Sequence, residues 1–159
     1  MSKSNILKLI VSLILPLGIG AFAGIFTLDA IPGWYETLNK PCFNAPNGIF
    51  GPVWTTLYFL MGISLFLIWK QGVSKERNRA ILVFIIQLIL NFCWSFLFFY
   101  YHQLGLALVE IILLWLSIFF MILLFYRIKP LAAYINIPYI LWVSFATILN
   151  AAYYFLNRV

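Results

Sequence analysis

Five apolar runs dominate the sequence, and each is long enough to cross a lipid bilayer. They cover residues 6–28, 50–69, 80–101, 104–126 and 131–156 of the 159. A transmembrane helix needs roughly 20 apolar residues, whereas a membrane β-strand needs about 10 residues of alternating polarity, and none of the runs alternates. Only 9% of the residues are charged, against about a quarter in soluble domains. We therefore expect an all-α membrane protein, a bundle of five transmembrane helices in a single domain over residues 1–159.

The basic residues predict how the bundle sits in the bilayer. With five spans, the N-terminus and the second and fourth connections lie on one side, and that side carries eight of the ten Lys and Arg residues. Because cytoplasmic segments are enriched in these residues, we expect a cytoplasmic N-terminus and an outer first connection, residues 29–49. The basic residues flank helices and form no groove interleaved with aromatic residues, which argues against a nucleic-acid partner.

The first apolar run has two interpretations. Lys3 and Lys8, the break at Pro16 and the small residues of Ala21-Phe22-Ala23 resemble a cleavable signal peptide. The run continues to Leu28, however, and that length favours a membrane span.

A pair of glycines in this run, Gly20 and Gly24, has the GxxxG spacing that lets two membrane helices approach closely. The spacing is compatible with packing inside the bundle and with a homodimer interface. Sequence alone leaves both open.

Polar and aromatic residues inside the runs converge on one region. Helical spacing places Trp54 and Tyr58 on one face of the second run. It gives the third run a stripe of Gln87, Asn91 and Trp94, and the fifth a stripe of Trp142, Ala146 and Asn150. Three helices thus direct a tryptophan and polar or small neighbours to one level, which predicts a cavity beneath the first connection. The Pro- and Gly-rich connection would cover it as a lid, with Pro52 in the first turn of the second helix.

Each of these residues also has a purely structural interpretation. Tryptophans form belts at membrane interfaces, and membrane asparagines often only join helices by hydrogen bonds. Trp142 fits a belt poorly, because it lies roughly 20 Å from the outer end of its run. Glu110 is either a protonated acid bonded to a neighbouring helix or a proton-relay group.

A series of short motifs carries a resemblance to a known family. The residues are Trp34-Tyr35, Leu38, Lys40-Pro41, Pro46, Gly51-Pro52-Val53-Trp54, Leu57-Tyr58, Leu90-Asn91, Trp94, Gly105, Ala107-Leu108-Val109-Glu110, Pro138-Tyr139, Trp142, Phe145-Ala146 and Leu149-Asn150. In this order and spacing, over about residues 30–151, they resemble the tryptophan-rich sensory protein / translocator protein (TspO/MBR, peripheral-type benzodiazepine receptor) family. The chain departs from the family pattern at Phe43 and Ala45, where a tryptophan and a proline pair are usual, and this bears on ligand preference more than on fold.

The resemblance implies an integral protein of a bacterial cell membrane, often dimeric, with a pocket for porphyrins and benzodiazepine-site ligands. Leu149, Tyr153 and Arg158 also fit a loose sterol-contact pattern. Trp54 and Trp142 match the tryptophans linked to light- and oxygen-dependent breakdown of protoporphyrin IX, which makes them the catalytic candidates. The candidate ligand-binding residues are Trp34, Pro46, Trp54, Tyr58, Asn91, Trp94, Trp142, Ala146 and Asn150.

The residue types suit a flat macrocycle better than a metal. Indole faces stack on planar rings, and Lys40 at the mouth could meet a carboxylate or serve as an interfacial anchor. Iron ligands are scarce, because His102 ends a helix and Cys93 is the only intramembrane thiol, so we expect no metal site and no bound cofactor. Hydrolytic catalysis finds no support.

Three functions remain open at the level of the sequence. The first is a sensor or carrier of protoporphyrin IX or haem held by its ring. The second is a photo-oxidative enzyme that degrades protoporphyrin IX. The third is a small transporter or partner-binding membrane module.

Overall fold

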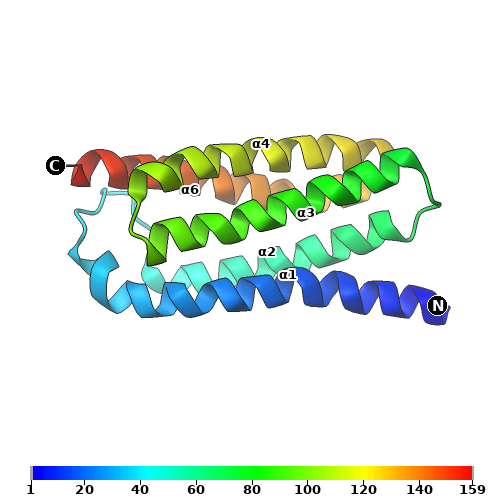
Figure 1. Cartoon of the computed structure of the whole chain (residues 1–159), viewed down its shortest axis with the longest axis horizontal. Coiled ribbons are helices and arrows are strands. Elements are labelled where there is room, and N and C mark those ends of the chain that lie inside the picture. The colour runs from blue at the N-terminus through cyan, green and yellow to red at the C-terminus, as the bar shows by residue number, and fades with distance from the viewer. Residues whose placement is uncertain (1, 159) are drawn as a thin grey trace.

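The computed structural model describes residues 2–158, and every regular element in that range is helical. The elements are α1 (Lys3–Ala30), η1 (Ile31–Tyr35), α2 (Asn47–Trp69), α3 (Lys75–Ser95), η2 (Phe96–Tyr100), α4 (Leu104–Ile128), α5 (Pro130–Ile135) and α6 (Ile137–Asn157). Five segments are long and apolar enough to cross a membrane. The long helices lie side by side, with the N- and C-termini at opposite ends of the bundle (Figure 1). The expected all-α bundle of five membrane-spanning segments is confirmed.

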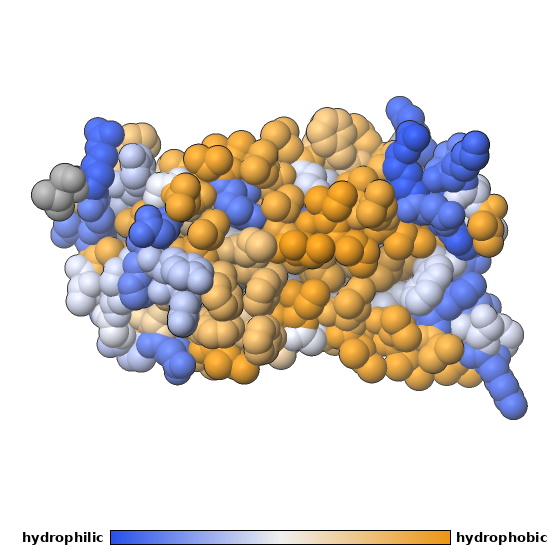
Figure 2. Space-filling view, in the orientation of Figure 1, coloured by the Kyte–Doolittle hydropathy of each residue, from blue (hydrophilic) through white to orange (hydrophobic). Residues whose placement is uncertain are grey.

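The surface divides into an apolar middle and two polar ends. Apolar side chains cover the central part of the face shown in Figure 2, and hydrophilic side chains gather at both ends. We call the end that carries residues 36–46, residues 101–103 and the C-terminus the loop end. The opposite end, with the N-terminus and the connection at 70–74, is the basic end. Such a belt of apolar side chains is what a lipid bilayer covers, so the chain is an integral membrane protein.

Neighbouring helices of the bundle pack along one another in opposite directions (Figure 1). α1 packs along α2, α3 along α4, and α4 along α6. The α1–α2 contact depends on two glycines. A Cβ at Gly62 would lie 2.8 Å from the carbonyl oxygen of Ser12, and a Cβ at Gly20 would overlap the ring of Tyr58. Gly20 therefore serves packing inside the bundle, which is one of the two roles expected of the GxxxG pair.

The fifth apolar run is not one continuous helix. α5 ends at Ile135 and α6 begins at Ile137, with Asn136 between them. Pro138 lies in the first turn of α6, and because proline has no N–H it cannot continue the hydrogen-bond ladder of α5. The Asn136 amide instead donates to the Ser64 hydroxyl at 2.5 Å and to the Ala132 carbonyl at 2.8 Å. Side-chain bonds thus replace the interrupted backbone bonds.

The first connection is shorter than the sequence suggested. The helix of the first run continues past residue 28 and widens into the π-helical turn η1, which ends at Tyr35. α2 begins at Asn47, with Pro46 as its N-cap, so Pro52 lies in the second helical turn and not in the first as expected. The remaining connection therefore spans only about ten residues above the bundle.

Candidate functional site

A cavity of about 680 Å³ lies within the loop end of the bundle. Its walls come from α1, α2, α3 and α6 and from the turns η1 and η2. Six of the residues predicted from the sequence line it, namely Trp54, Tyr58, Trp94, Trp142, Ala146 and Asn150. Among the described residues, no lining side chain carries a formal charge. The cavity is therefore large, aromatic and neutral.

The aromatic walls are ordered by stacking. The ring of Trp54 stacks on Tyr58 with centroids 5.6 Å apart and an interplanar angle of 28°. Trp94 faces Trp54 at 6.4 Å and 33°. On the α6 side, Trp142 makes an edge contact with Phe50 at 6.0 Å. Such rings present broad, polarisable faces, which suit a planar apolar ligand.

Two polar side chains join the cavity walls. The indole N–H of Trp94 in α3 donates to the side-chain carbonyl of Asn150 in α6 at 3.0 Å. The amide of Asn150 donates in turn to the backbone carbonyl of Leu104 at 3.0 Å. Both Trp94 and Asn150 are buried, so these bonds fix their orientation as well as satisfying their polar atoms.

A buried hydrogen-bond chain supports the cavity from the side of the basic end. The Tyr58 hydroxyl donates to the Asn91 side-chain carbonyl. The amide of Asn91 donates to the hydroxyl of Tyr139 at 3.1 Å, and that hydroxyl donates to Gln87 at 2.7 Å. Asn91 does not line the cavity but positions Tyr58, which does.

The connection above the cavity is tied down at three places. Near its start, the Tyr35 hydroxyl donates to Asn44 at 3.0 Å, and the hydroxyl of Tyr153 lies 2.8 Å from that of Tyr35. The backbone N–H of Asn39 donates to the side chain of Asn157 at 2.8 Å, and Asn157 donates back to the Asn39 carbonyl at 3.1 Å. The end of α6 thus holds the connection as a closed lid.

The third tie is ionic. The Lys40 ammonium donates to Glu36 at 2.7 Å, and the amide of Asn47 donates to the other carboxylate oxygen, also at 2.7 Å. These bonds, the one from Lys40 first, lower the pKa of Glu36 below its ordinary value of 4.5. Lys40 also lies 5.5 Å from the centre of the Tyr35 ring, which lines the cavity. Its positive charge therefore stands at the mouth.

Besides Asn91, two predicted site residues lie outside the cavity lining, Trp34 and Pro46. Trp34 stacks on His102, with centroids 4.0 Å apart and an interplanar angle of 13°, and touches Phe98 edge-on at 5.8 Å. Pro46 is exposed at the N-cap of α2. Trp34 thus joins the first connection to the turn after η2, and Phe98 carries that contact to the cavity.

Several lining residues were absent from the predicted set. They include the whole α1 wall, from Leu17 to Leu28, for which no site residue was predicted. The missed aromatic residues of the two π-helical turns and the end of α6 are Tyr35, Phe98, Phe99 and Tyr153. A π-helical turn widens the backbone and cannot be recognised from helical periodicity. Tyr153 had a usable signal, because it lies on the Ala146–Asn150 stripe, one turn further on.

Comparison with known proteins identifies the family. The model of the TspO/MBR family matches residues 12–156. The chain belongs to the TspO/MBR family. A tryptophan-rich protein TspO of Archaeoglobus fulgidus is 41% identical over 153 residues, covering 96% of this chain and 99% of that protein. A tryptophan-rich protein TspO of Chlorobaculum tepidum is 39% identical over 149 residues, covering 93% of this chain and 94% of that protein. The translocator protein of Homo sapiens is 37% identical over 119 residues, which are 74% of this chain and 70% of that one.

The departures from the TspO/MBR pattern lie on the lid. Phe43 is 45% exposed, and neither it nor Ala45 lines the cavity. Because both lie between the tied residues Lys40 and Asn47, they alter the lid and leave the aromatic walls unchanged.

In this TspO/MBR chain, the three residues of the sterol-contact pattern do not all have side chains exposed on the surface of the bundle. Tyr153 is fully buried and is bonded to Tyr35 and Asn44, while Leu149 lines the cavity. Only Arg158 is exposed, stacked over Phe155 at 4.7 Å. The central residue of the pattern therefore serves the lid.

Glu110 is buried away from the cavity. Neither of its carboxylate oxygens has a hydrogen-bond partner among the described residues. The bond to a neighbouring helix that the sequence suggested is therefore not formed. An unpaired carboxyl group at this depth is far cheaper to bury protonated than charged.

Proposed function

We propose that this TspO/MBR protein binds a metal-free porphyrin, or a related flat apolar macrocycle, and acts as its sensor or carrier. The observation that carries the proposal is the presence of Trp54, Trp94 and Trp142 on the walls of one neutral cavity. Its volume of about 680 Å³ lies in the range of ligand pockets, roughly 300–1,000 Å³. The surface of a macrocycle is mostly aromatic, so these walls remove it from lipid or water without requiring a charged partner.

The acidic substituents of such a ligand define its orientation. Carboxylates are costly to bury in a neutral cavity, so they would lie at the loop end. There Asn47 lines the cavity and Lys40 stands above Tyr35. The macrocycle would lie with its ring inside the cavity and its acids at the membrane surface.

The lining of the cavity favours a metal-free porphyrin over haem, because it offers, among the described residues, no free side chain that could bind iron. The lining contains no histidine or cysteine within residues 2–158. The hydroxyls of Tyr35, Tyr58 and Tyr153 are each already hydrogen-bonded to protein groups. We therefore expect protoporphyrin IX to bind at least as tightly as haem. A tighter haem complex, with a shifted Soret band that disappears in Cys93→Ala, would count against this expectation.

The proposal includes an orientation in the membrane. The basic end carries eight of the ten Lys and Arg residues, so it would face the cytoplasm. They are Lys3, Lys8, Lys70, Lys75, Arg77, Arg79, Arg127 and Lys129. The lid and the cavity then belong to the outer half of the bilayer.

A second candidate function is light- and oxygen-dependent breakdown of the bound porphyrin. It is favoured by the position of Trp54 and Trp142, two oxidisable indoles from different helices that line the same cavity. The excited pigment with oxygen would generate the oxidant, and the protein would confine it beside these rings.

One titration with two stages tests both functions. Protoporphyrin IX is added in the dark to the purified protein while tryptophan fluorescence is followed, and the complex is then illuminated with and without oxygen. Saturable quenching supports the binding function, and its absence would refute it. A product that requires protein, light and oxygen, and that is lost in Trp54→Phe or Trp142→Phe, supports the enzyme. Binding without such a product leaves the sensor or carrier.

A further inference from the structure

The contact between α1 and α2 changes from tight to open along its length. Toward the basic end, Gly62 and Gly20 bring the two helices together so closely that a Cβ at either position would clash. Toward the loop end, a Cβ at Gly24, Gly48 or Gly51 would meet nothing within 4 Å. The seam between the helices is therefore closely packed at Gly20 and Gly62 and has free space beside the glycines nearer the lid.

The part of the seam nearer the lid is a side wall of the cavity. Residues of both helices line the cavity and are exposed on the outside of the bundle: Ala21, Ile25 and Leu28 of α1, and Gly48, Gly51 and Thr55 of α2. Ile25 is 54% and Leu28 71% exposed. These positions belong to membrane-spanning segments and none is charged, so lipid acyl chains surround them.

The lid between the cavity and water is, by contrast, tied to the bundle by several bonds. The lid is held by the Tyr35–Asn44–Tyr153 cluster and by the reciprocal Asn39–Asn157 pair. Opening it would break several hydrogen bonds and the Glu36–Lys40 ion pair together.

We propose that the seam between α1 and α2 is a lateral gate through which the ligand passes between the cavity and the leaflet at the loop end, while the lid stays closed. The inference rests on the porphyrin-binding function proposed above and specifies the source of the ligand. It implies a substrate class of membrane-dissolved planar molecules with an acidic edge. Such molecules lie near the headgroups with their rings among the acyl chains, at the level of Gly51 and Ile25.

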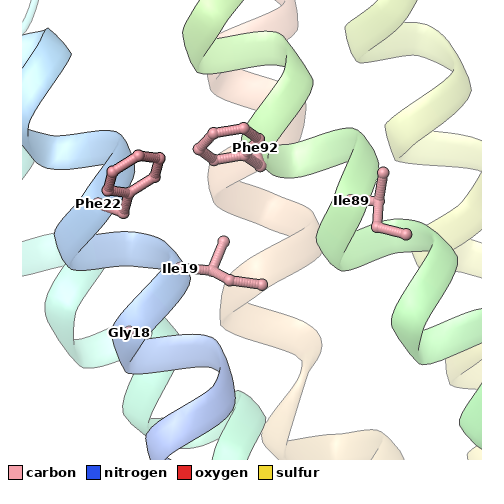
Figure 3. A pocket seen from close by; sticks show the side chains of 5 residues that line it. All are labelled: Gly18, Ile19, Phe22, Ile89 and Phe92. Carbon is pink, nitrogen blue, oxygen red and sulfur yellow. The ribbon is translucent and has the colours of Figure 1, made fainter.

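The test is kinetic and uses a variant that narrows the gate. In Gly51→Leu the Cβ of the new side chain would clash with no neighbouring atom, and the rest of the side chain would fill the open part of the seam between α1 and α2. The matched control is Gly18→Leu. Gly18 also has nothing within 4 Å, yet it lies in a shallow groove on the outside of the bundle between α1 and α3, lined by Ile19, Phe22, Ile89 and Phe92 (Figure 3).

Protein in liposomes is mixed with protoporphyrin IX, and the rate of tryptophan quenching is measured. Release is measured by mixing loaded liposomes with an excess of empty ones. In Gly51→Leu we expect the rate constants of uptake and release both to fall by about tenfold. The affinity, which is set by the ratio of these two rate constants, should then change less than either of them. Gly18→Leu should keep the wild-type rates. Wild-type rates in Gly51→Leu would overturn the gate while leaving the binding function intact. No saturable binding in the wild type would overturn both.

A second variant separates the gate from the lid. Asn39→Cys and Asn157→Cys, in a chain with Cys42→Ala and Cys93→Ala, allow a disulfide to lock the lid where the two asparagines now meet. Because the gate does not require lid opening, the oxidised and reduced forms should take up porphyrin at the same rate. Slower uptake in the oxidised form, restored by a reductant, would assign access to the lid and refute the gate.

Discussion

The indole N–H of Trp94 and the side-chain carbonyl of Asn150 form a hydrogen bond of 3.0 Å between α3 and α6. Both helices pack on α4, and this bond sets their separation at the level of the cavity. A ligand-sized opening is thus held by a polar contact in an otherwise apolar interior.

We expect Trp94→Phe and Asn150→Leu each to destabilise the protein, with a coupling of about 0.5–2 kcal/mol between them. The physical reason is that each single change leaves a buried polar group without its partner. The free energy of unfolding in mixed micelles, measured for the two single variants and the double variant, gives the coupling. Purely additive effects would show that the bond does not join the walls.

Gly20→Ala should cost about 1–3 kcal/mol of unfolding free energy, because the added methyl group overlaps the ring of Tyr58. Gly18→Ala has open space on the same helix and should be neutral or slightly stabilising. Unfolding of both variants under identical detergent conditions makes the comparison. Equal effects of the two changes would be incompatible with the close α1–α2 contact.

Lys40→Gln should weaken the binding of protoporphyrin IX by roughly two- to fivefold, the scale of an exposed ion pair. The effect should be absent for the dimethyl ester of the same porphyrin, which has no free carboxylates. Dark fluorescence titrations of both ligands measure it. An equal loss of affinity for protoporphyrin IX and for its dimethyl ester would mean that Lys40 acts on the lid and not on the ligand.

Glu36 predicts a pH dependence of the lid. Because its hydrogen bonds with Lys40 and Asn47 lower its pKa, the pairing stabilises the folded lid above the ordinary pKa of 4.5 and is lost as the pH falls through the lowered pKa. NMR titration of the Glu36 carboxyl group should give a midpoint below 4.5, and Lys40→Gln should raise it. A midpoint that stays in place without Lys40 would contradict the assigned cause.

The sequence allowed the five spans and the tryptophan-bearing parts of the cavity wall in α2, α3 and α6 to be predicted, because both depend on local rules, whereas the α1 wall was not predicted. Span length follows from bilayer thickness, and helical spacing places Trp54 with Tyr58 and Trp142 with Ala146 and Asn150. The polar residues inside the spans were informative because most buried polar groups need a hydrogen-bond partner, although Glu110 has none among the described residues.

What could not be predicted depends on contacts between distant segments. Asn91 shares a stripe with Trp94, but only the position of Tyr58 and Tyr139 decides that it supports the cavity from behind. Trp34 turns away to stack on His102, whose left-handed backbone (φ 57°) no local pattern indicates. The break at Asn136 likewise depends on Ser64, which lies in another helix.

The central claim is that the ligand occupies the cavity between Trp54, Trp94 and Trp142, and a cavity-filling variant tests it most directly. Ala146 is buried on the cavity wall, whereas Leu141 on the same helix is 64% exposed toward lipid. In dark titrations with protoporphyrin IX, Ala146→Phe should weaken binding by more than about tenfold, while Leu141→Phe should bind like the wild type. Wild-type affinity in a folded Ala146→Phe variant would place the ligand elsewhere and contradict the account.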